Sequence, residues 1–250
     1  MSQPVLLLIP GMSNTPAVWG PTRAHLGEGD GLEVRVIDVR QAADIPAMAR
    51  AGWRALADLP AERPVLLAGF SMGGYVALQM LAQAPRPVQG LALVCSSARP
   101  DSPDSAPMRE RAIAAATRDY AKYVNSVTQW LLAHAPDIDP ALLQAIRADQ
   151  LAAGAEATVA QQRAVSLRAD QRPLLRGLGI PLLAVAGERD QLVPPALSRE
   201  AAELAPGARL EIVPGVGHLL PWEAPQGLGT LLRGWALAVH QELQSQGDPS

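Results

Sequence analysis

The sequence predicts an α/β fold with a mostly parallel, twisted sheet and helices on both of its faces. Short apolar runs alternate with helix-like patterns over most of the chain, which is typical of a parallel sheet with helical crossovers. The chain has 250 residues, of which 48% are hydrophobic, so it is long enough to bury one sizeable core. One long stretch shows helical patterns and no strand pattern. We therefore expect a single α/β core that carries a helical insertion.

Six segments have the length and pattern of β-strands. Most are continuous apolar runs, as expected for strands that are buried on both faces, and the last one alternates polar with apolar residues. The expected strands are Val5 to Ile9, Glu33 to Asp38, Val65 to Ala68, Leu91 to Cys95, Leu182 to Ala186 and Arg209 to Val213. Because helical patterns separate consecutive strands, we expect the strands to be parallel.

Helical patterns occupy the intervals between these strands. The expected apolar positions are Trp53, Leu56, Ala57 and Leu59 on one helix, and Val76, Leu78, Met80 and Leu81 on a second. The second helix should be buried against the sheet. We expect the chain to close with a helix over Leu228 to Leu243, followed by a polar tail from Gln244 to Ser250.

The insertion opens with a proline- and serine-rich segment, Arg99 to Pro107, which can continue neither a strand nor a helix. Apolar residues then recur every three or four positions from Tyr120 to Leu131 and from Ala141 to Leu151, as in amphipathic helices. The expected division is a core of residues 1–98 and 173–250 and a helical unit of residues 99–172.

The most informative motif is Gly69-Phe70-Ser71-Met72-Gly73, which lies between an expected strand and the helix that follows it. A serine on such a tight turn projects its hydroxyl above the sheet, and the flanking glycines remove side chains that would collide there. The N-terminus of the following helix favours developing negative charge. Ser71 is therefore the candidate nucleophile.

A serine nucleophile needs a base, and the base needs an orienting partner. Asp190 lies in the loop after an expected strand, and His218 follows the last strand in a glycine-rich loop. We predict that His218 is the base and that Asp190 is the acid that orients it. Glu188 and Asp101 stay open as alternative acids.

The remaining histidines give no sign of a second base or of a metal site. His25, His134 and His240 are expected at the surface or in helix packing, because none of them follows a strand into a loop. No two histidines are closely spaced, and Cys95 is the single cysteine. We therefore expect no metal, no cofactor and no internal disulfide.

Taken in the order Ser71, Asp190 and His218, these motifs resemble the α/β-hydrolase fold superfamily over nearly the whole chain. The segment Val5 to Met12 resembles the early strand and oxyanion loop of that superfamily, and Gly217-His218 resembles its histidine loop. The resemblance implies an α/β-hydrolase fold, in which the helical insertion is a cap laid over the nucleophile.

The resemblance also implies a mechanism. Ser71 would attack an acyl carbonyl while His218 takes its proton, and Asp190 would stabilise the imidazolium that forms. The product of this step is a covalent acyl-enzyme, which water then hydrolyses. By the same resemblance, the backbone N–H groups of Met12 and Met72 form the oxyanion hole.

Within the superfamily, the chain is similar to small bacterial hydrolases such as 3-oxoadipate enol-lactonases, pimeloyl-carrier-protein methyl esterases and cofactor-free haloperoxidase-type esterases. This similarity implies a serine hydrolase that cleaves a small, largely apolar carboxylic ester, a lactone or a thioester. Aromatic rings with a polar handle suit a substrate pocket, so Trp130, Tyr120 and Tyr123 are expected to line it. Arg168 and Arg172 are candidates to neutralise a substrate carboxylate.

Two other classes of function stay open, because a fold does not determine a reaction. One is a non-hydrolytic enzyme, such as a lyase or a cofactor-free oxygenase or perhydrolase, which keeps the same three side chains without an acyl intermediate. The other is a non-enzymatic receptor that uses them to bind a small molecule.

Charge and hydropathy narrow the possible partners. The net charge of -3 gives no basic patch, so we expect no nucleic-acid partner. The apolar run Val5 to Ile9 is too short for a membrane span or a secretory signal. We expect a cytoplasmic location, which the single cysteine also fits. The oligomeric state stays open.

Overall fold

The computed structural model describes residues 2–27 and 31–246 of the chain. Within these residues, six strands form one parallel sheet in the order β2-β1-β3-β4-β5-β6. The strands are β1 (Val5–Ile9), β2 (Glu33–Val36), β3 (Val65–Phe70), β4 (Gly90–Val94), β5 (Leu182–Gly187) and β6 (Arg209–Val213). The predicted fold class is confirmed, and each predicted strand is present.

The bounds of β1 and β6 are as predicted, and those of the other four strands differ from the prediction by one or two residues. β2 ends at Val36 rather than at Asp38. β3 continues through Phe70, which pairs with Val94 of β4. The next backbone N–H, that of Ser71, donates to the carbonyl oxygen of Val94 at 2.8 Å. The longer strand therefore carries the sheet's hydrogen bonds up to the candidate nucleophile.

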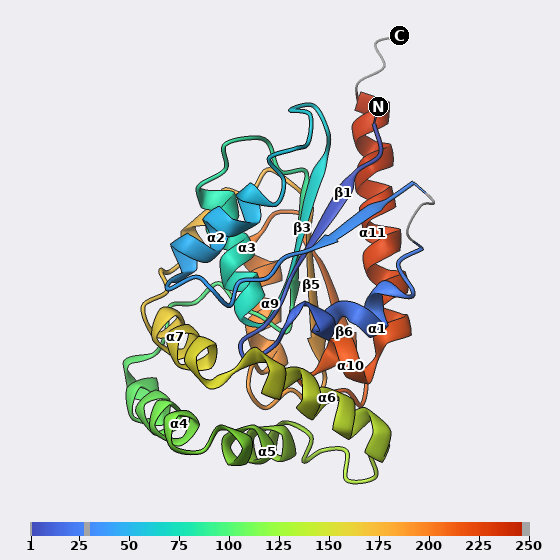
Figure 1. Cartoon of the computed structure of the whole chain (residues 1–250). Helices are drawn as coiled ribbons and strands as arrows, with labels where there is room; N and C mark the ends of the chain where they lie inside the picture. Colours follow the sequence, from blue (N-terminus) through green and yellow to red (C-terminus); the bar gives the residue numbers. More distant parts are fainter. Residues whose placement is uncertain (1, 28–30, 247–250) are drawn as a thin grey trace.

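Helices connect the strands and cover both faces of the sheet (Figure 1). Helices α2, α3 and α9 lie against one face, and α1 and α11 lie against the other. The core helices are η1 (Pro16–Trp19), α1 (Gly20–Arg23), α2 (Ile45–Arg54), α3 (Met72–Ala82), α8 (Arg172–Arg176), α9 (Pro195–Leu204), α10 (Leu220–Glu223) and α11 (Pro225–Gln246). Among the described residues, no helix has both the length and the apolar character that crossing a bilayer requires.

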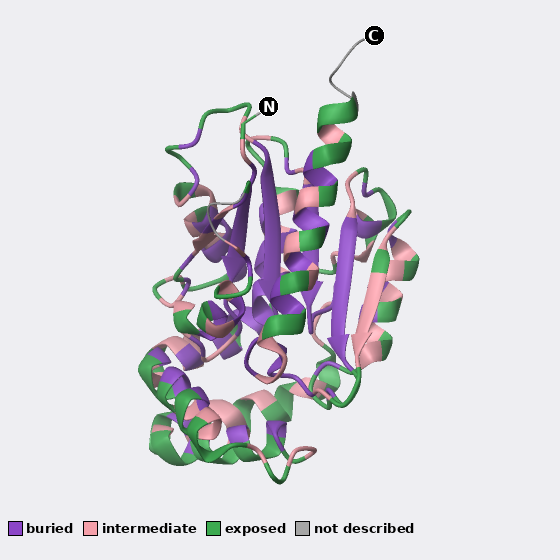
Figure 2. Cartoon of the chain, turned by 90° about the vertical axis from the view of Figure 1, so that its right-hand side faces the viewer, coloured by how far each residue is buried: buried purple, intermediate pink, exposed green. Residues whose placement is uncertain are grey.

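Each face of the sheet has its own apolar core. Val5, Leu7 and Ile9 of β1 belong to the cluster beneath α2, α3 and α9, whereas Leu6 and Leu8 belong to the cluster beneath α11. Successive side chains of a strand point to opposite faces, so a strand that is covered on both sides needs a continuous apolar run. Figure 2 shows the result, because the central strands are coloured as buried along their length.

Two helices depart from the sequence prediction. α2 ends at Arg54, so Leu56 and Leu59 lie beyond its end although both are buried. The apolar character of these two residues correctly indicated that they are buried, but the prediction that they lie on the helix is wrong. The last helix begins earlier than predicted, at Pro225, because proline is well tolerated in the first turn of a helix.

Residues 99–172, which we call the cap, lie beyond the carboxyl ends of the strands (Figure 1). Their helices are η2 (Pro103–Ser105), α4 (Ala106–Arg118), α5 (Tyr120–Leu131), α6 (Pro140–Ala153) and α7 (Ala155–Ser166). Helix α4 packs against both α5 and α7, and α5 packs against α6. In Figure 2 the cap helices show many exposed and half-buried residues, in contrast to the central strands.

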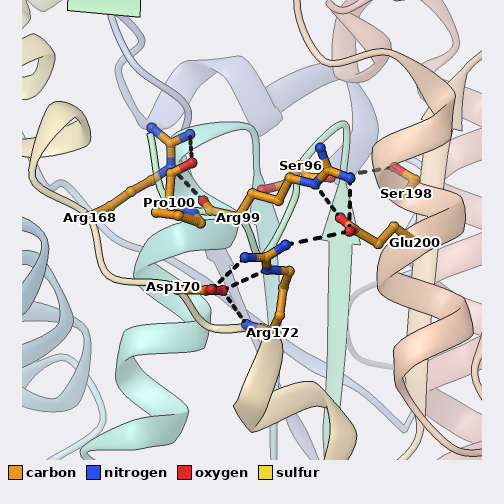
Figure 3. Close-up of polar contacts among 8 residues, drawn as sticks. All are labelled: Ser96, Arg99, Pro100, Arg168, Asp170, Arg172, Ser198 and Glu200. Carbon is orange, nitrogen blue, oxygen red and sulfur yellow. Dashed lines mark hydrogen bonds and ion pairs between the residues drawn. The ribbon is translucent and has the colours of Figure 1, made fainter. Parts of the chain in front are cut away.

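A hydrogen bond and ion pairs join the two segments through which the chain enters and leaves the cap (Figure 3). The guanidinium of Arg168 donates to the carbonyl oxygen of Arg99 at 2.9 Å. Glu200 of α9 pairs with Arg99 at 2.6 Å and with Arg172 at 3.9 Å. The base of the cap is therefore tied to a core helix from both of its chain connections.

Candidate active site

Ser71 lies on the turn between β3 and α3, where its backbone adopts φ 53° and ψ -117°. A residue other than glycine with positive φ is uncommon and strained, and such residues often cluster at functional sites. The glycines of the motif are required by space. A Cβ at Gly69 would overlap the backbone of Gly73, and a Cβ at Gly73 would overlap the carbonyl oxygen of Ile9.

The structure brings Ser71, Asp190 and His218 together. Nε2 of His218 lies 3.0 Å from Oγ of Ser71, and Nδ1 of His218 lies 2.7 Å from Oδ2 of Asp190. An ionised carboxylate can only accept hydrogen bonds, so Nδ1 carries the proton and Nε2 accepts from the serine hydroxyl. This chain of hydrogen bonds has the direction that transfer of the Ser71 proton to His218 would need, and the catalytic roles of the three residues stay predictions.

Asp190 is itself tightly bound by its loop. Its Oδ1 accepts the backbone N–H groups of Leu192 at 2.9 Å and of Val193 at 2.8 Å. The carboxylate is buried, and the imidazole of His218 is only 4% exposed. The ring of Phe70 lies against the imidazole with a centroid separation of 5.3 Å. These contacts leave His218 little freedom to turn.

Cys95 borders the same site from the end of β4. Its sulfur and the ligand atoms of Asp190 and His218 all lie within 4.8 Å of one another. Burial, and then the nearby charge of Asp190, raises the pKa of the Cys95 thiol well above its ordinary value. The other two groups, the imidazole of His218 and the carboxylate of Asp190, are already hydrogen-bonded to each other. This donor set therefore suits a hydrogen-bonded site better than a metal site.

The two predicted oxyanion donors lie near the nucleophile in the chain or in the sheet. Met72 is the first residue of α3, so its N–H has no acceptor within the helix. Met12 follows β1, which pairs with β3, and its N–H makes no hydrogen bond within the described part of the chain. Both N–H groups are thus free to donate to an oxyanion, and this role stays a prediction.

Polar groups of the cap bind the loop that follows Met12. The backbone N–H of Ser13, at φ 56°, donates to Oε1 of Gln161 at 2.9 Å. Asp149 accepts the side chain of Asn14 at 3.0 Å and both the backbone N–H and the hydroxyl of Thr15. Burial raises the pKa of Asp149 above its ordinary value, although these hydrogen bonds oppose the rise. The sequence did not predict this network, because its partners are far apart in the chain and no local pattern indicates their contact.

The three predicted pocket residues lie on α5. The rings of Tyr120 and Tyr123 stack with a centroid separation of 6.0 Å inside a small apolar cluster of the cap. The hydroxyl of Tyr120 donates to the carbonyl oxygen of Gln150 at 2.7 Å, which is a contact within the cap. Trp130 is 46% exposed. Their role in a pocket stays a prediction.

The alternative acids lie in other hydrogen bonds. Glu188 is exposed and accepts the backbone N–H of Gly215 at 2.8 Å. Asp101 lies at the base of the cap, where it accepts the guanidinium groups of Arg109 and of Arg168, the latter at 2.8 Å. Neither is bonded to His218 in this structure.

The arginines proposed to neutralise a substrate carboxylate are engaged in the protein. Arg168 is bonded to Asp101 and also lies over the ring of Tyr75, 4.4 Å from its centroid. Arg172 pairs with Asp170 at 2.6 Å (Figure 3). Both therefore contribute to the base of the cap.

The remaining histidines differ from one another. His25 is exposed, and His240 is buried on α11, where burial lowers its pKa below the ordinary value. His134 is buried in packing against the core rather than at the surface. Its Nε2 lies 2.7 Å from Oε2 of Glu223, and the ring packs against Gly217, next to His218.

Comparison with known proteins identifies the family. The model of the alpha/beta hydrolase family matches residues 6–229. The pimeloyl-[acyl-carrier protein] methyl ester esterase of Neisseria meningitidis is 32% identical over 214 residues, which are 83% of this chain and 78% of that protein. The biotin biosynthesis bifunctional protein BioHC of Cellvibrio japonicus is 29% identical and covers 91% of this chain, which spans 46% of that protein. The predicted enzyme class, a carboxylic ester hydrolase, is confirmed by the named esterases among these relatives.

Solved structures give the same fold. A thermophilic esterase from Thermogutta terrifontis has a TM-score of 0.82 and 27% identity, covering 96% of this chain and 91% of that chain. MenH from S. aureus has a TM-score of 0.84 and covers 96% of both chains, and at 19% identity it supports the fold alone. The family match and these relatives lead to one conclusion: the chain belongs to the alpha/beta hydrolase family.

Proposed function

We propose that this protein is a serine esterase that acts through an acyl-enzyme on Ser71. The observation that carries the proposal is the hydrogen-bonded series from Ser71 through His218 to Asp190, with separations of 3.0 Å and 2.7 Å. In this geometry the base can reach the proton that it must remove. The acid faces the opposite nitrogen of the ring and can stabilise the imidazolium.

The reaction would proceed in two steps. Ser71 attacks the carbonyl carbon of the ester as His218 takes its proton, and His218 then returns that proton to the leaving alcohol. Water next attacks the carbonyl carbon of the acyl-enzyme while His218 takes a proton from it. His218 then returns that proton to Oγ of Ser71 as the bond from Oγ to the acyl group breaks and the carboxylic acid leaves. The backbone N–H groups of Met12 and Met72 would bind the oxyanion in both steps, and loss of one such donor typically costs about 10² to 10³ in kcat.

Our first candidate substrate is a small, largely apolar carboxylic ester, with lactones and thioesters as close alternatives. Ion pairs engage both Arg168 and Arg172, so a substrate carboxylate would have to compete with Asp101 or Asp170 for either of them. We also propose that the cap, residues 99–172, acts as the lid that encloses the acyl group.

A second candidate is a methyl ester of an acyl group carried on an acyl-carrier protein. The name of the Neisseria meningitidis relative favours it, at 32% identity over 83% of this chain. That reaction uses the same chemistry at Ser71 and differs in the size of the substrate.

A cytoplasmic location, a reaction without a cofactor and the absence of a nucleic-acid partner stay predictions.

Active-site labelling and a substrate panel test the proposal. A fluorophosphonate should modify Ser71 in the wild-type protein and should fail to modify Ser71→Ala. Methyl and p-nitrophenyl esters, lactones and thioesters should then be compared as free compounds, together with a methyl ester on an acyl-carrier protein. A burst of p-nitrophenol indicates the acyl-enzyme. Absence of both labelling and hydrolysis would favour a lyase, an oxygenase or a receptor.

A further inference from the structure

The loop that carries His218 is bound by a single carboxylate on both sides of that residue. Glu223, the last residue of α10, accepts the backbone N–H of Gly217 through Oε2 at 3.0 Å. Its other oxygen, Oε1, accepts the backbone N–H of Leu219 at 2.9 Å. The backbone N–H groups of the two residues next to His218 are therefore bonded to one side chain, which is only 8% exposed.

A third hydrogen bond reaches Glu223 from the cap. Nε2 of His134, in the connection between α5 and α6, lies 2.7 Å from Oε2 of Glu223, and the His134 side chain is 5% exposed. Because an ionised carboxylate only accepts hydrogen bonds, Nε2 of His134 is the donor. Its Nδ1 is buried and has no hydrogen-bond partner among the residues that the structure describes. Glu223 is therefore the hydrogen-bond partner of this ring among the described residues.

The contact between the cap and the loop is also tight in space. A Cβ at Gly217 would overlap Cε1 of His134, so the imidazole ring lies directly against the backbone of Gly217. Glycine is needed at this position for the close approach of the two chain segments. A movement of His134 would therefore be felt at the residue that precedes His218.

We propose that Glu223 is a positioning residue for His218, and that His134 completes this placement, so that the seating of the cap is coupled to the catalytic base. The inference rests on the proposed function, in which His218 removes the proton of Ser71. Glu223 does not touch the reacting atoms. It acts by keeping Nε2 of His218 at the 3.0 Å separation from Oγ of Ser71.

The kinetic test separates positioning from substrate binding. Glu223→Gln should lower kcat about 10- to 100-fold, because a small misplacement of a catalytic group has effects of this size, while KM changes little. His134→Phe keeps a ring but removes the donor, and it should lower kcat roughly 3- to 10-fold for the same reason. His134→Gln restores an N–H donor and should recover part of the loss. Glu203→Gln and His25→Gln, at exposed positions, are the matched controls and should leave kcat unchanged.

A spectroscopic test decides the inference even if no ester is hydrolysed. The Nδ1 proton of His218, shared with Asp190, should give a low-field proton NMR signal that Asp190→Asn removes. In Glu223→Gln this signal should broaden or disappear through faster exchange with water, and in His134→Phe it should shift or broaden. The His134 variants also cover the case in which Glu223→Gln does not fold. An unchanged signal in every folded variant would overturn the inference, whereas failure of Ser71 labelling alone would count against the proposed function.

Discussion

The contacts inside the core differ in kind from the contacts inside the cap. In the core, all residues of β1, β3, β4 and β5 are buried, and most of them are apolar. In the cap, buried polar side chains are frequent: they are Thr128, Asp149, Gln150, Thr158, Gln161 and Gln162. Apolar burial is strong and has no preferred direction, whereas hydrogen bonds are weaker and depend on geometry.

We infer from this difference that the core mainly determines the stability of the fold, whereas the polar bonds of the cap mainly determine how the loops of the site are aligned. The core supplies a rigid edge on which Ser71, Asp190 and His218 are placed by strand ends. The cap contacts the core partly through apolar side chains such as Ile146 and Val165, which belong to the two core clusters. It also makes polar bonds to the loops of the site, through Gln161, Asp149 and His134. These polar bonds align the loops. A change in the core should therefore affect the whole molecule, and a change in the cap should affect mainly the site and the cap itself.

The largest expected effect is chemical and lies in the core. Asp190→Asn should lower kcat by about 10⁴-fold, because an amide at this position favours the wrong tautomer of the base. Its fold should be preserved, since the substitution is isosteric. Steady-state kinetics with the ester found in the substrate panel measures the effect, and Glu188→Gln is the matched control. A large loss of kcat in Glu188→Gln, together with nearly unchanged kcat in Asp190→Asn, would assign the acid to Glu188 instead.

The next effect is on the stability of the core. Leu67 lies in the central strand β3 and is fully buried, so Leu67→Ala should lower the free energy of unfolding by about 2–5 kcal/mol. Amide hydrogen exchange should become faster in both the strands and the cap. Leu167→Ala, at a side chain that is 84% exposed, is the control. If exchange changed only in the strands, the cap would be stable without the core.

The smallest effect is confined to the cap and depends on pH. Burial raises the pKa of Asp101, but the hydrogen bonds and charges of Arg109 and Arg168 outweigh it and leave the pKa below the ordinary value of 3.8. A carboxyl group with a lowered pKa in the folded state stabilises that state fully at pH values above the pKa of the group in the unfolded chain. This stabilisation is lost as the pH falls through the pKa of the folded state. Asp101→Asn should therefore cost about 1.5–3 kcal/mol at pH 6, and the difference from wild type should shrink below about pH 3.9.

Hydrogen exchange of peptides from α4 and α7, compared between pH 6 and pH 3.5, measures this last effect. Peptides from β3 and β4 should respond alike in wild type and Asp101→Asn at both pH values. A pH-independent difference between the two proteins would contradict the lowered pKa. A response in the strands as large as that in the cap would contradict the separation of the two regions.

Sequence alone predicted the sheet and the three side chains that the structure brings together, because each has a local signal. Strands appear as apolar runs, and Ser71, Asp190 and His218 each follow such a run in a turn or loop. The contacts between cap and core have no such signal. Asn14 and Asp149 are 135 positions apart, and His134 and Glu223 are 89 apart. Their meeting depends on how helices pack, which no short pattern records.

The position of Cys95 gives the protein a natural reporter of its own opening. It is the single cysteine of the chain and is fully buried beside Asp190. A thiol reagent can reach it only when the residues that bury it move apart, so the rate at which one reagent mass is added to the protein measures that opening. The enzyme can therefore be followed at its chemical centre without any introduced label.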